Sequence, residues 1–289
     1  MIENAGSQVF IVKRSGEREP FSEAKLRRSL EKALASPDMI DNIVRHIQGE
    51  LKEGMTTSEI YRQAFSLLKK YHFPIAARYS LKQAIMDLGP EGHFFEKFVG
   101  ELVKSKGFTV EVGKVVEGFC VEHEVDVVGK KNDYHIMVEC KFHNSLGIKS
   151  DVKVALYVQA RFEDIERKWR AQPGHGHKFH EAWLVTNTKL TSDAIRYAAC
   201  VDMKTIGWSY PEKHSLQSLT EQSGLHPLTC LTSLNNSQKR HLLNQGAILC
   251  RDLVRKVDLL RSAGVVPVDI PKVAKEIGEL CQIPNLDML

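Results

Sequence analysis

The stretch Glu124–His143, which reads EVDVVGKKNDYHIMVECKFH, decides the fold of the middle of the chain. Two runs rich in apolar residues flank the polar segment KKND, a pattern that predicts two β-strands joined by a hairpin turn. Side chains two residues apart on a strand face the same side of the sheet, so Glu139 and Lys141 share a face. Opposite charges on one face of such a strand indicate either a solvated edge or part of an active site.

The register of this hairpin decides which charges meet. With the turn at residues 130–133, residues 129 and 134 pair, which places Asp126 one diagonal step from Glu139. A slip of two residues would still bring the two carboxylates to one face of the sheet. We therefore expect two acids and one lysine in a small area.

Two carboxylates at that separation repel each other unless a cation lies between them. Hard oxygen ligands with few protein contacts suit Mg²⁺, which keeps several of its waters and joins substrate phosphates. Lys141 beside the metal can orient a water molecule and offset negative charge on a phosphorus centre. Glu96, on the preceding helix, can complete the metal shell. The alternative is a hairpin with one solvated, charged face.

Composition sets wider limits on the chain. Its 289 residues fit two or three domains, and its 43% hydrophobic and 26% charged residues are typical of a globular protein. The net charge of +4 permits a polyanionic partner without requiring one. The start of the sequence has no signal-peptide pattern, and no apolar run is long enough for a membrane span. The scattered cysteines form no C-x-x-C pair, which favours a reducing cytoplasm and speaks against a disulfide framework.

Hydrophobic periodicity divides the chain into three domains. Residues 1–90 read as a mostly helical domain with a minor β element, in which Thr56 and Glu59 have capping-box spacing. Residues 91–212 alternate helix and strand, which predicts an α/β layer. Residues 213–289 have almost no strand pattern and read as a small helical domain. The expected fold class is therefore multi-domain α/β.

The central domain resembles a known family of nucleases. Asp126, followed one hairpin later by Glu139, Cys140 and Lys141, is similar to the PD-(D/E)xK signature, and the order of elements resembles the catalytic domain of Mrr-type restriction endonucleases. In that family a helix with a glutamate, here Glu96, precedes the aspartate strand. The closing segment AWLVTNTKLTSDAIRYAACVDMKTIGW is also similar, with its T-x-x-A-x-x-Y-A run at Thr191, Ala194, Tyr197 and Ala198. One departure is Val125, where the family often has proline.

This resemblance implies hydrolysis of DNA phosphodiester bonds at a metal centre. Asp126, Glu139 and the backbone carbonyl of Cys140 would bind Mg²⁺, Lys141 would position the nucleophilic water, and Glu96 would support the shell.

The N-terminal region concentrates basic residues around a turn, and such groups can bind a triphosphate. The order of segments in this region resembles an ATP-cone, a regulatory nucleotide-binding module. The matching parts are IVKRSG at residues 11–16, Phe21, Lys25, TTSEI at 56–60 and AARYSL at 76–81. The resemblance implies binding of ATP or dATP, with contacts from Val12, Lys13, Arg14, Lys25 and Thr57. The chain has no P-loop motif, so we expect nucleotide sensing and not nucleotide hydrolysis. The alternative is a basic turn that binds DNA phosphates or nothing.

Together these patterns predict a nucleotide-regulated, Mg²⁺-dependent DNA endonuclease of the cytoplasm, serving restriction or defence. Cutting both strands of a duplex needs two centres, which favours a homo-oligomer. Two other interpretations remain open: a nucleotide-responsive DNA-binding regulator whose nuclease-like domain is only a scaffold, and an adaptor within a larger defence complex.

The segment QPGHGHKFH, residues 172–180, is expected to be a loop of histidines and not a zinc site.

Overall fold

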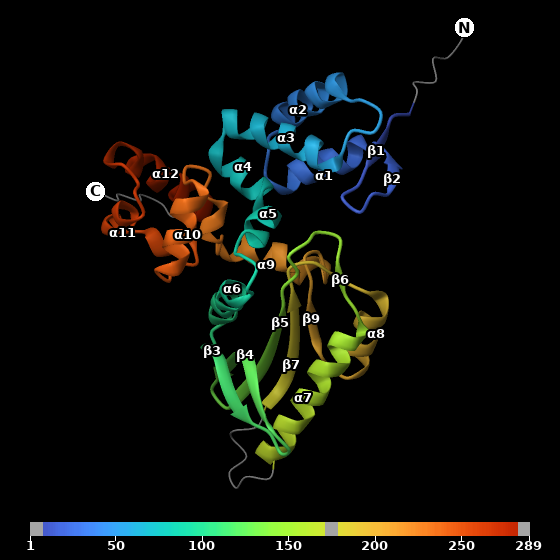
Figure 1. Cartoon of the computed structure of the whole chain (residues 1–289), viewed down its shortest axis with the longest axis vertical. Helices are drawn as coiled ribbons and strands as arrows, with labels where there is room; N and C mark the ends of the chain where they lie inside the picture. The colour runs from blue at the N-terminus through green and yellow to red at the C-terminus, as the bar shows by residue number, and fades with distance from the viewer. Residues whose placement is uncertain (1–7, 171–178, 283–289) are drawn as a thin grey trace.

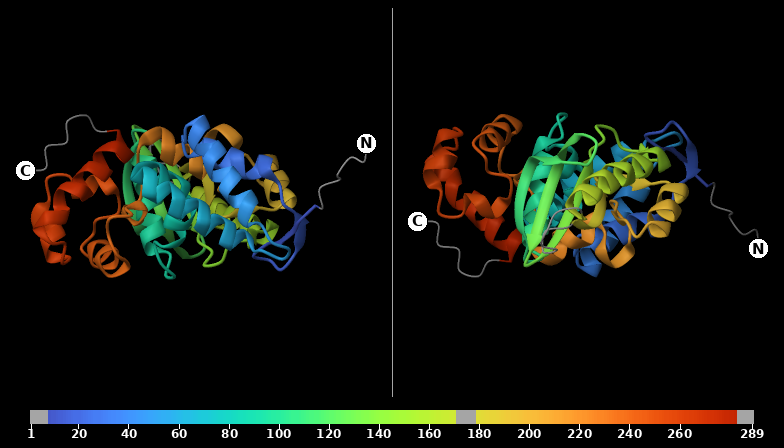
Figure 2. Two further views of the ribbon diagram at one scale, coloured as in Figure 1. Left: turned by 90° about the horizontal axis from the view of Figure 1, so that it is seen from above. Right: turned by 90° about the horizontal axis from the view of Figure 1, so that it is seen from below.

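The computed structural model describes residues 8–170 and 179–282 and divides into three units (Figure 1). Helices of the N-terminal unit lie over one end of a β-sheet unit, and a group of C-terminal helices lies to one side of both. The end-on views in Figure 2 show the same arrangement. The expected class, multi-domain α/β with helical units at both ends of the chain, is confirmed.

A short hairpin and four helices form the N-terminal unit. Their bounds are β1 (Phe10–Val12), β2 (Arg18–Pro20), α1 (Glu23–Lys32), α2 (Pro37–Glu50), α3 (Thr57–Tyr71) and α4 (Phe73–Tyr79). The predicted capping box is present, since the Thr56 side chain accepts from the Glu59 N–H and the Glu59 carboxylate accepts from the Thr56 N–H. Leu30, Ile47 and Leu68 form the centre of a core that belongs to this unit alone.

The chain leaves the N-terminal unit through a broken helix. The sequence predicts one continuous helix from Pro74 to Gly89, and this prediction is wrong: α4 ends at Tyr79, and a separate α5 (Leu81–Met86) begins after Ser80. The Ser80 hydroxyl donates to the Ala77 carbonyl at 3.0 Å, a local bond that competes with the helical backbone pattern. As a result, α5 points its apolar residues into the core of the next unit.

A five-stranded sheet forms the middle of the molecule, in the order β3-β4-β5-β7-β9. The strands are β3 (Thr109–Glu117), β4 (Glu122–Lys131), β5 (Tyr134–Lys141), β7 (Phe179–Thr186) and β9 (Lys204–Ile206), and the small pair β6 (Lys149–Ser150) and β8 (Lys189–Leu190) lies beside it. The first three strands are antiparallel, whereas β7 and β9 run parallel to β5 and to each other. The edge strand β3 has no counterpart in the sequence analysis.

Helices cover both faces of this sheet. On one face α6 (His93–Lys104) packs Phe95 and Phe98 against Val127 and Val138. On the other face lie α7 (Val152–Arg170) and α8 (Ser192–Cys200). His180, which the sequence placed in a loop, lies in β7, where its Nδ1 accepts from the His135 N–H. His175 and His177 lie outside the described residues.

The register of the β4–β5 hairpin differs from the prediction by two residues. Gly129 pairs with Ile136, not with residue 134, because the turn contains only Asn132 and Asp133. Asn132 adopts a positive φ of 54°, which asparagine tolerates better than most residues, and this allows so tight a turn. The slip moves Asp126 from opposite residue 137 to the level of Glu139.

The C-terminal unit is helical, as predicted. Its helices are α9 (Leu216–Ser223), α10 (Asn236–Asn244), α11 (Val257–Ser262) and α12 (Ile270–Cys281). The buried carboxylate of Glu276 on α12 accepts from the backbone N–H groups and hydroxyls of Thr232 and Ser233, which ties α12 to the loop before α10. Within residues 8–170 and 179–282, none of the helices combines the length and apolar character needed to cross a membrane.

Candidate active site and nucleotide pocket

The acidic site forms where β4 and β5 separate. Backbone pairing of these strands runs from the turn as far as Val127 and Val138 and then stops. Just beyond this point the Asp126 carboxylate takes the place of a backbone partner and accepts from the Cys140 N–H at 2.7 Å. Asp126 and Glu139 are the next residues in this register, so the end of the ladder brings the two predicted metal ligands together.

Burial and mutual repulsion raise the pKa of three carboxyl groups in this area. Burial together with the Asp126 charge raises the pKa of Glu139 to about 7. Burial, with Asp126 and Glu124 nearby, also raises the pKa of Glu96 to about 7. Burial raises the pKa of Asp126 as well, against the opposing effect of the hydrogen bond from Cys140. Glu96 on α6 therefore lies within electrostatic range of the hairpin, as the sequence predicted.

Two cations counter part of this charge. Lys141 is exposed at the end of β5, and its charge lowers the pKa of both Asp126 and Glu139. Arg161 on α7 is buried, and its guanidinium donates to the Glu139 carboxylate and to the Glu124 carbonyl. The sequence analysis missed Arg161. The signal was available, because an arginine at this position interrupts the apolar stripe that Ala155, Val158 and Ile165 form on α7.

The donor set suits a hard divalent cation by its chemistry, since two carboxylates and a main-chain carbonyl offer only oxygen. The present arrangement is not a closed cage. Within residues 8–170 and 179–282, no three His, Cys, Asp or Glu side chains are grouped so as to hold a metal ion. Glu139 is instead engaged by Arg161. Metal binding by Asp126, Glu139 and the Cys140 carbonyl therefore stays a prediction, and it requires Arg161 to share or release Glu139.

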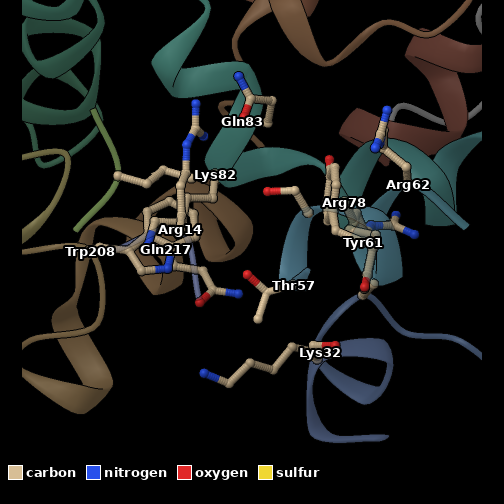
Figure 3. A pocket seen from close by; sticks show the side chains of 15 residues that line it. Arg14, Lys32, Thr57, Tyr61, Arg62, Arg78, Lys82, Gln83, Trp208 and Gln217 are labelled. Atoms are coloured by element: carbon tan, nitrogen blue, oxygen red, sulfur yellow. The ribbon is translucent and has the colours of Figure 1, made fainter. Parts of the chain in front are cut away.

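A second site lies between the N-terminal unit and the sheet unit. It is a cavity of about 720 Å³, shown in Figure 3. Its walls carry five basic side chains, and no acidic side chain is among the described residues that line it. The basic residues are Arg14, Lys32, Arg62, Arg78 and Lys82. A cavity with only one sign of charge on its walls favours a ligand of the opposite sign.

The predicted nucleotide contacts divide into two groups. Arg14 and Thr57 line the cavity. Lys13 and Lys25 do not line it: both contact the Glu19 carboxylate, at 3.1 Å and 2.9 Å, on the outside of the β1–β2 hairpin. Val12 is also outside the lining, where its N–H donates to the Met55 carbonyl and fixes β1 beside the start of α3.

Aromatic and buried basic side chains complete the cavity. Tyr61 and Tyr79 are stacked with ring centroids 5.3 Å apart and interplanar angle 10°, which provides a flat apolar surface. Burial lowers the pKa of Arg78 and of Lys82, although Glu221 and Glu279 act in the opposite direction at Arg78. Sequence reasoning assigned no role to Lys32, Arg62, Arg78, Lys82 or Trp208, although Arg78 lies within the AARYSL segment that resembles the ATP-cone.

Relatives of the chain place it in a family. A protein of Archaeoglobus fulgidus, described as an uncharacterized protein, is 38% identical over 156 residues, which cover 54% of this chain and 83% of that protein. The crystal structure of a protein of unknown function, AF1548, is 34% identical, covers 66% of this chain and 98% of its own, and superposes with a TM-score of 0.53. This chain belongs to the AF1548-like family.

Family models match the three units of this AF1548-like chain. An ATP cone domain matches residues 9–87, a restriction endonuclease domain of the Mrr type matches residues 89–206, and the AF1548-like C-terminal domain matches residues 226–281. The predicted recognition, an ATP-cone fused to an Mrr-type domain of the PD-(D/E)xK superfamily, is confirmed. The structure of MspJI restriction endonuclease in complex with a 27-mer oligonucleotide also aligns, at 11% identity over 64% of this chain and 39% of its own. Its TM-score of 0.32 is too low to carry an argument.

Proposed function

We propose that this AF1548-like protein is a nucleotide-regulated, Mg²⁺-dependent DNA endonuclease. The observation that carries the proposal is the group of Asp126, Glu139 and Lys141 at the point where β4 and β5 separate, with the Asp126 carboxylate on the Cys140 backbone. This group lies in a domain of the restriction-endonuclease family. A solvated hairpin face gives no reason for the pKa of Glu139 to rise to about 7 through burial and a neighbouring acid.

In this mechanism Asp126, Glu139 and the Cys140 carbonyl would hold the metal ion, which when bound would lower the pKa of a water molecule and offset charge on the scissile phosphate. Lys141 would orient that water and offset the charge that develops on the phosphate oxygens. Arg161 donates to the Glu139 carboxylate from α7 and fixes its orientation. Glu96 would support the metal site with a further carboxylate.

The regulatory half of the proposal rests on the cavity between the N-terminal and sheet units. Its five basic side chains suit a polyphosphate, and the Tyr61–Tyr79 stack suits a base. The ligand we propose is ATP or dATP. Two nuclease centres are needed to cut both strands of a duplex, so we propose that a homo-oligomer acts on DNA, in restriction or defence.

The test is plasmid cleavage in Mg²⁺ with and without ATP or dATP, comparing wild type with Lys141→Ala. Loss of Lys141 should slow cleavage by on the order of a thousandfold, or about 4 kcal/mol in the activation barrier. Lys104→Ala is the matched control, since Lys104 is a surface lysine on α6 that pairs with Glu101. The proposal requires that wild type cuts and that nucleotide changes its rate.

A second function remains in competition, namely a DNA-binding regulator that responds to nucleotide. The engagement of Glu139 by Arg161 favours it, because a carboxylate held by an arginine is less free to bind metal. Nucleotide-dependent DNA binding without cleavage, in Mg²⁺ and in Mn²⁺, would establish this alternative.

A further inference from the structure

Part of the nucleotide cavity comes from segments beyond the N-terminal unit, two of them next to strands of the sheet and one on α9 of the C-terminal unit. Leu146 lies in the segment after β5, Trp208 follows β9, and Gln217 is on α9. In Figure 3, Trp208 and Gln217 lie toward one end of the cavity near Arg14, whereas Tyr61 and Arg62 lie toward the other. An ATP-cone alone would therefore present an incomplete cavity, open at the Trp208 end.

Positive charge without a counter-charge gathers at the Trp208 end. The Lys82 ammonium lies 5.6 Å from the centre of the Trp208 ring, within the range of a cation–π contact. Burial and the neighbouring Lys189 both lower the pKa of Lys82. Among the residues that the structure describes, neither Lys82 nor Arg14 forms an ion pair. An anionic group at this end would relieve both cations.

Trp208 is held in place by its own backbone. Its N–H donates to the Thr188 carbonyl at 2.7 Å, and its carbonyl accepts from the Gln217 N–H at 3.3 Å. These bonds fix the Trp208 backbone between the turn after β7 and the first turn of α9, and its side chain packs against the buried core. A fixed ring can hold the Lys82 side chain in one orientation, so little conformational entropy is lost when a ligand binds there.

We propose that the nuclease domain completes the nucleotide site. In this arrangement the polyphosphate lies against Arg14 and Lys82 at the Trp208 end, Trp208 positions Lys82, and the base lies toward the Tyr61–Tyr79 stack. The inference rests on the nucleotide binding proposed above and adds where the phosphates lie. The contact between the two units then distinguishes nucleotides by their number of phosphates.

A buried polar network leads from this end toward the acidic site. Thr188 joins Thr186 through their hydroxyls at 3.3 Å, Thr186 accepts from the Ser150 hydroxyl at 3.3 Å, and Ser150 contacts the His143 ring at 2.9 Å. His143 follows Lys141 by two residues, and Leu146 of the same segment lines the cavity. Phosphate at the Trp208 end therefore stabilises the segment that follows Lys141.

The experiment measures ATP and AMP binding to the full chain by calorimetry, for wild type, Trp208→Ala and Trp208→Phe. We expect Trp208→Ala to lower the affinity for ATP by about tenfold and the affinity for AMP by less than about threefold. The reason is that only the distal phosphates lose contact with a lysine, Lys82, that Trp208 holds in position. Trp208→Phe keeps a ring for Lys82 and should bind ATP within about threefold of wild type. Tyr71→Ala, an exposed aromatic residue at the end of α3, is the control.

A second readout follows the segment after β5. Hydrogen exchange over residues 142–148 should slow when ATP binds to wild type and should not slow in Trp208→Ala at saturating ATP. This comparison also shows whether each variant keeps the exchange protection of the core strands.

Equal ATP affinity in wild type and Trp208→Ala would overturn the composite site. Equal losses of ATP and AMP would overturn the placement of the phosphates. If wild type binds no nucleotide, both this inference and the regulatory half of the proposed function fall. If ATP binds as expected but no DNA is cut, the composite site stands and only the nuclease half falls.

Discussion

The two sites of this molecule are electrostatic opposites. At the end of the β4–β5 ladder, buried acids hold too few cations, and the pKa of Glu96 and of Glu139 rises to about 7. In the cavity above, burial lowers the pKa of the half-buried cations Arg78 and Lys82, although Glu221 and Glu279 oppose this shift at Arg78. Each site carries charge that its own residues do not neutralise. The sign of that excess indicates the sign of the ligand: a cation for the sheet, a polyanion for the cavity.

The acidic site and the cavity also differ in which parts of the chain supply their residues. The acidic site comes mainly from one hairpin, and only Glu96 and Arg161 come from helices. The cavity takes side chains from four helices of the N-terminal half, from two segments next to strands of the sheet and from α9 of the C-terminal unit. A site within one hairpin depends on local geometry, whereas a site between units depends on how the units pack.

The largest effect is expected when charge is removed from the acidic site while the cavity is left unchanged. Asp126→Asn should reduce Mg²⁺-dependent cleavage by on the order of a thousandfold, because the amide cannot neutralise a metal ion. Affinity for ATP should stay as in wild type. Asp193→Asn is the matched control, since Asp193 is exposed on α8 and pairs with Arg196. A weaker ATP affinity in Asp126→Asn would show that the two sites are not independent in this respect.

The opposite change tests the cavity. Arg14→Gln should weaken ATP binding by at least about tenfold, since a charge-assisted hydrogen bond is worth about 1.5–3 kcal/mol. Fluorescence anisotropy of a labelled ATP measures the loss. Arg45→Gln on the exposed face of α2 removes the same charge away from the cavity and should have no effect. Equal losses of ATP affinity in the two variants would mean that the affinity depends on the net charge of the protein and not on the basic side chains of the cavity.

The free energy of unfolding should depend on pH through the acidic site. The folded protein binds the Glu139 proton more tightly than the unfolded chain does, because its pKa rises from 4.5 to about 7. Stability from this group is therefore lost as pH rises from about 4.5 to about 7, by on the order of 3 kcal/mol. Urea unfolding without divalent ions at several pH values measures it. Glu139→Gln should make this dependence shallower and leave the part that is due to Glu96, and an unchanged slope would contradict the raised pKa of Glu139.

The affinity for divalent cations should change with pH in the opposite direction to the free energy of unfolding. A cation displaces protons from Glu96 and Glu139, so affinity should rise as pH rises from 6 to 8, by about tenfold or more. Titration calorimetry with Mg²⁺ or Mn²⁺ gives the slope. Glu96→Gln leaves both proposed ligands in place and should make the slope shallower. Affinity that does not change with pH would mean that the cation binds elsewhere.

The smallest expected effect distinguishes the cavity from the β1–β2 hairpin. Lys25→Gln should change ATP affinity by less than about twofold, since Lys25 contacts Glu19 on the surface and exposed ion pairs contribute little. The same binding assay as for Arg14→Gln applies. A loss as large as that of Arg14→Gln would restore Lys25 as a phosphate contact and would show that the hairpin rearranges on binding.

The sequence could predict which charged residues of this hairpin lie together because strand alternation is local, whereas their roles stay predictions. Glu139 and Lys141 share a face by their spacing alone, and a slip of two residues was consistent with Asp126 joining them. The sequence did not decide between the two registers, because KKND is compatible with a turn of four residues or of two. Asn132 selected the shorter turn by accepting a positive φ.

Contacts that depend on packing escaped sequence reasoning. Arg161 reaches Glu139 only because α7 crosses the sheet at that level. Trp208 and Lys82 are far apart in the sequence and meet only because α5 turns into the second unit. Lys13 and Lys25 matched a family pattern, yet the conformation of the β1–β2 hairpin pairs both with Glu19. A motif thus indicates which segments contribute to a site, whereas packing determines which of their side chains face the ligand.

The break at Ser80 has a consequence for the modularity of the chain. Leu81, Ala84 and Ile85 are buried in the core that contains Phe95 and Phe98, although they lie within residues 9–87 of the ATP cone match. Cutting the gene at residue 88 would leave the apolar face of α5 in water on one fragment and a hole in the core of the other. Cutting before Leu81 would spare the second core but take Lys82 from the first fragment. Both units therefore depend on α5, so the chain cannot be divided there into two independent modules.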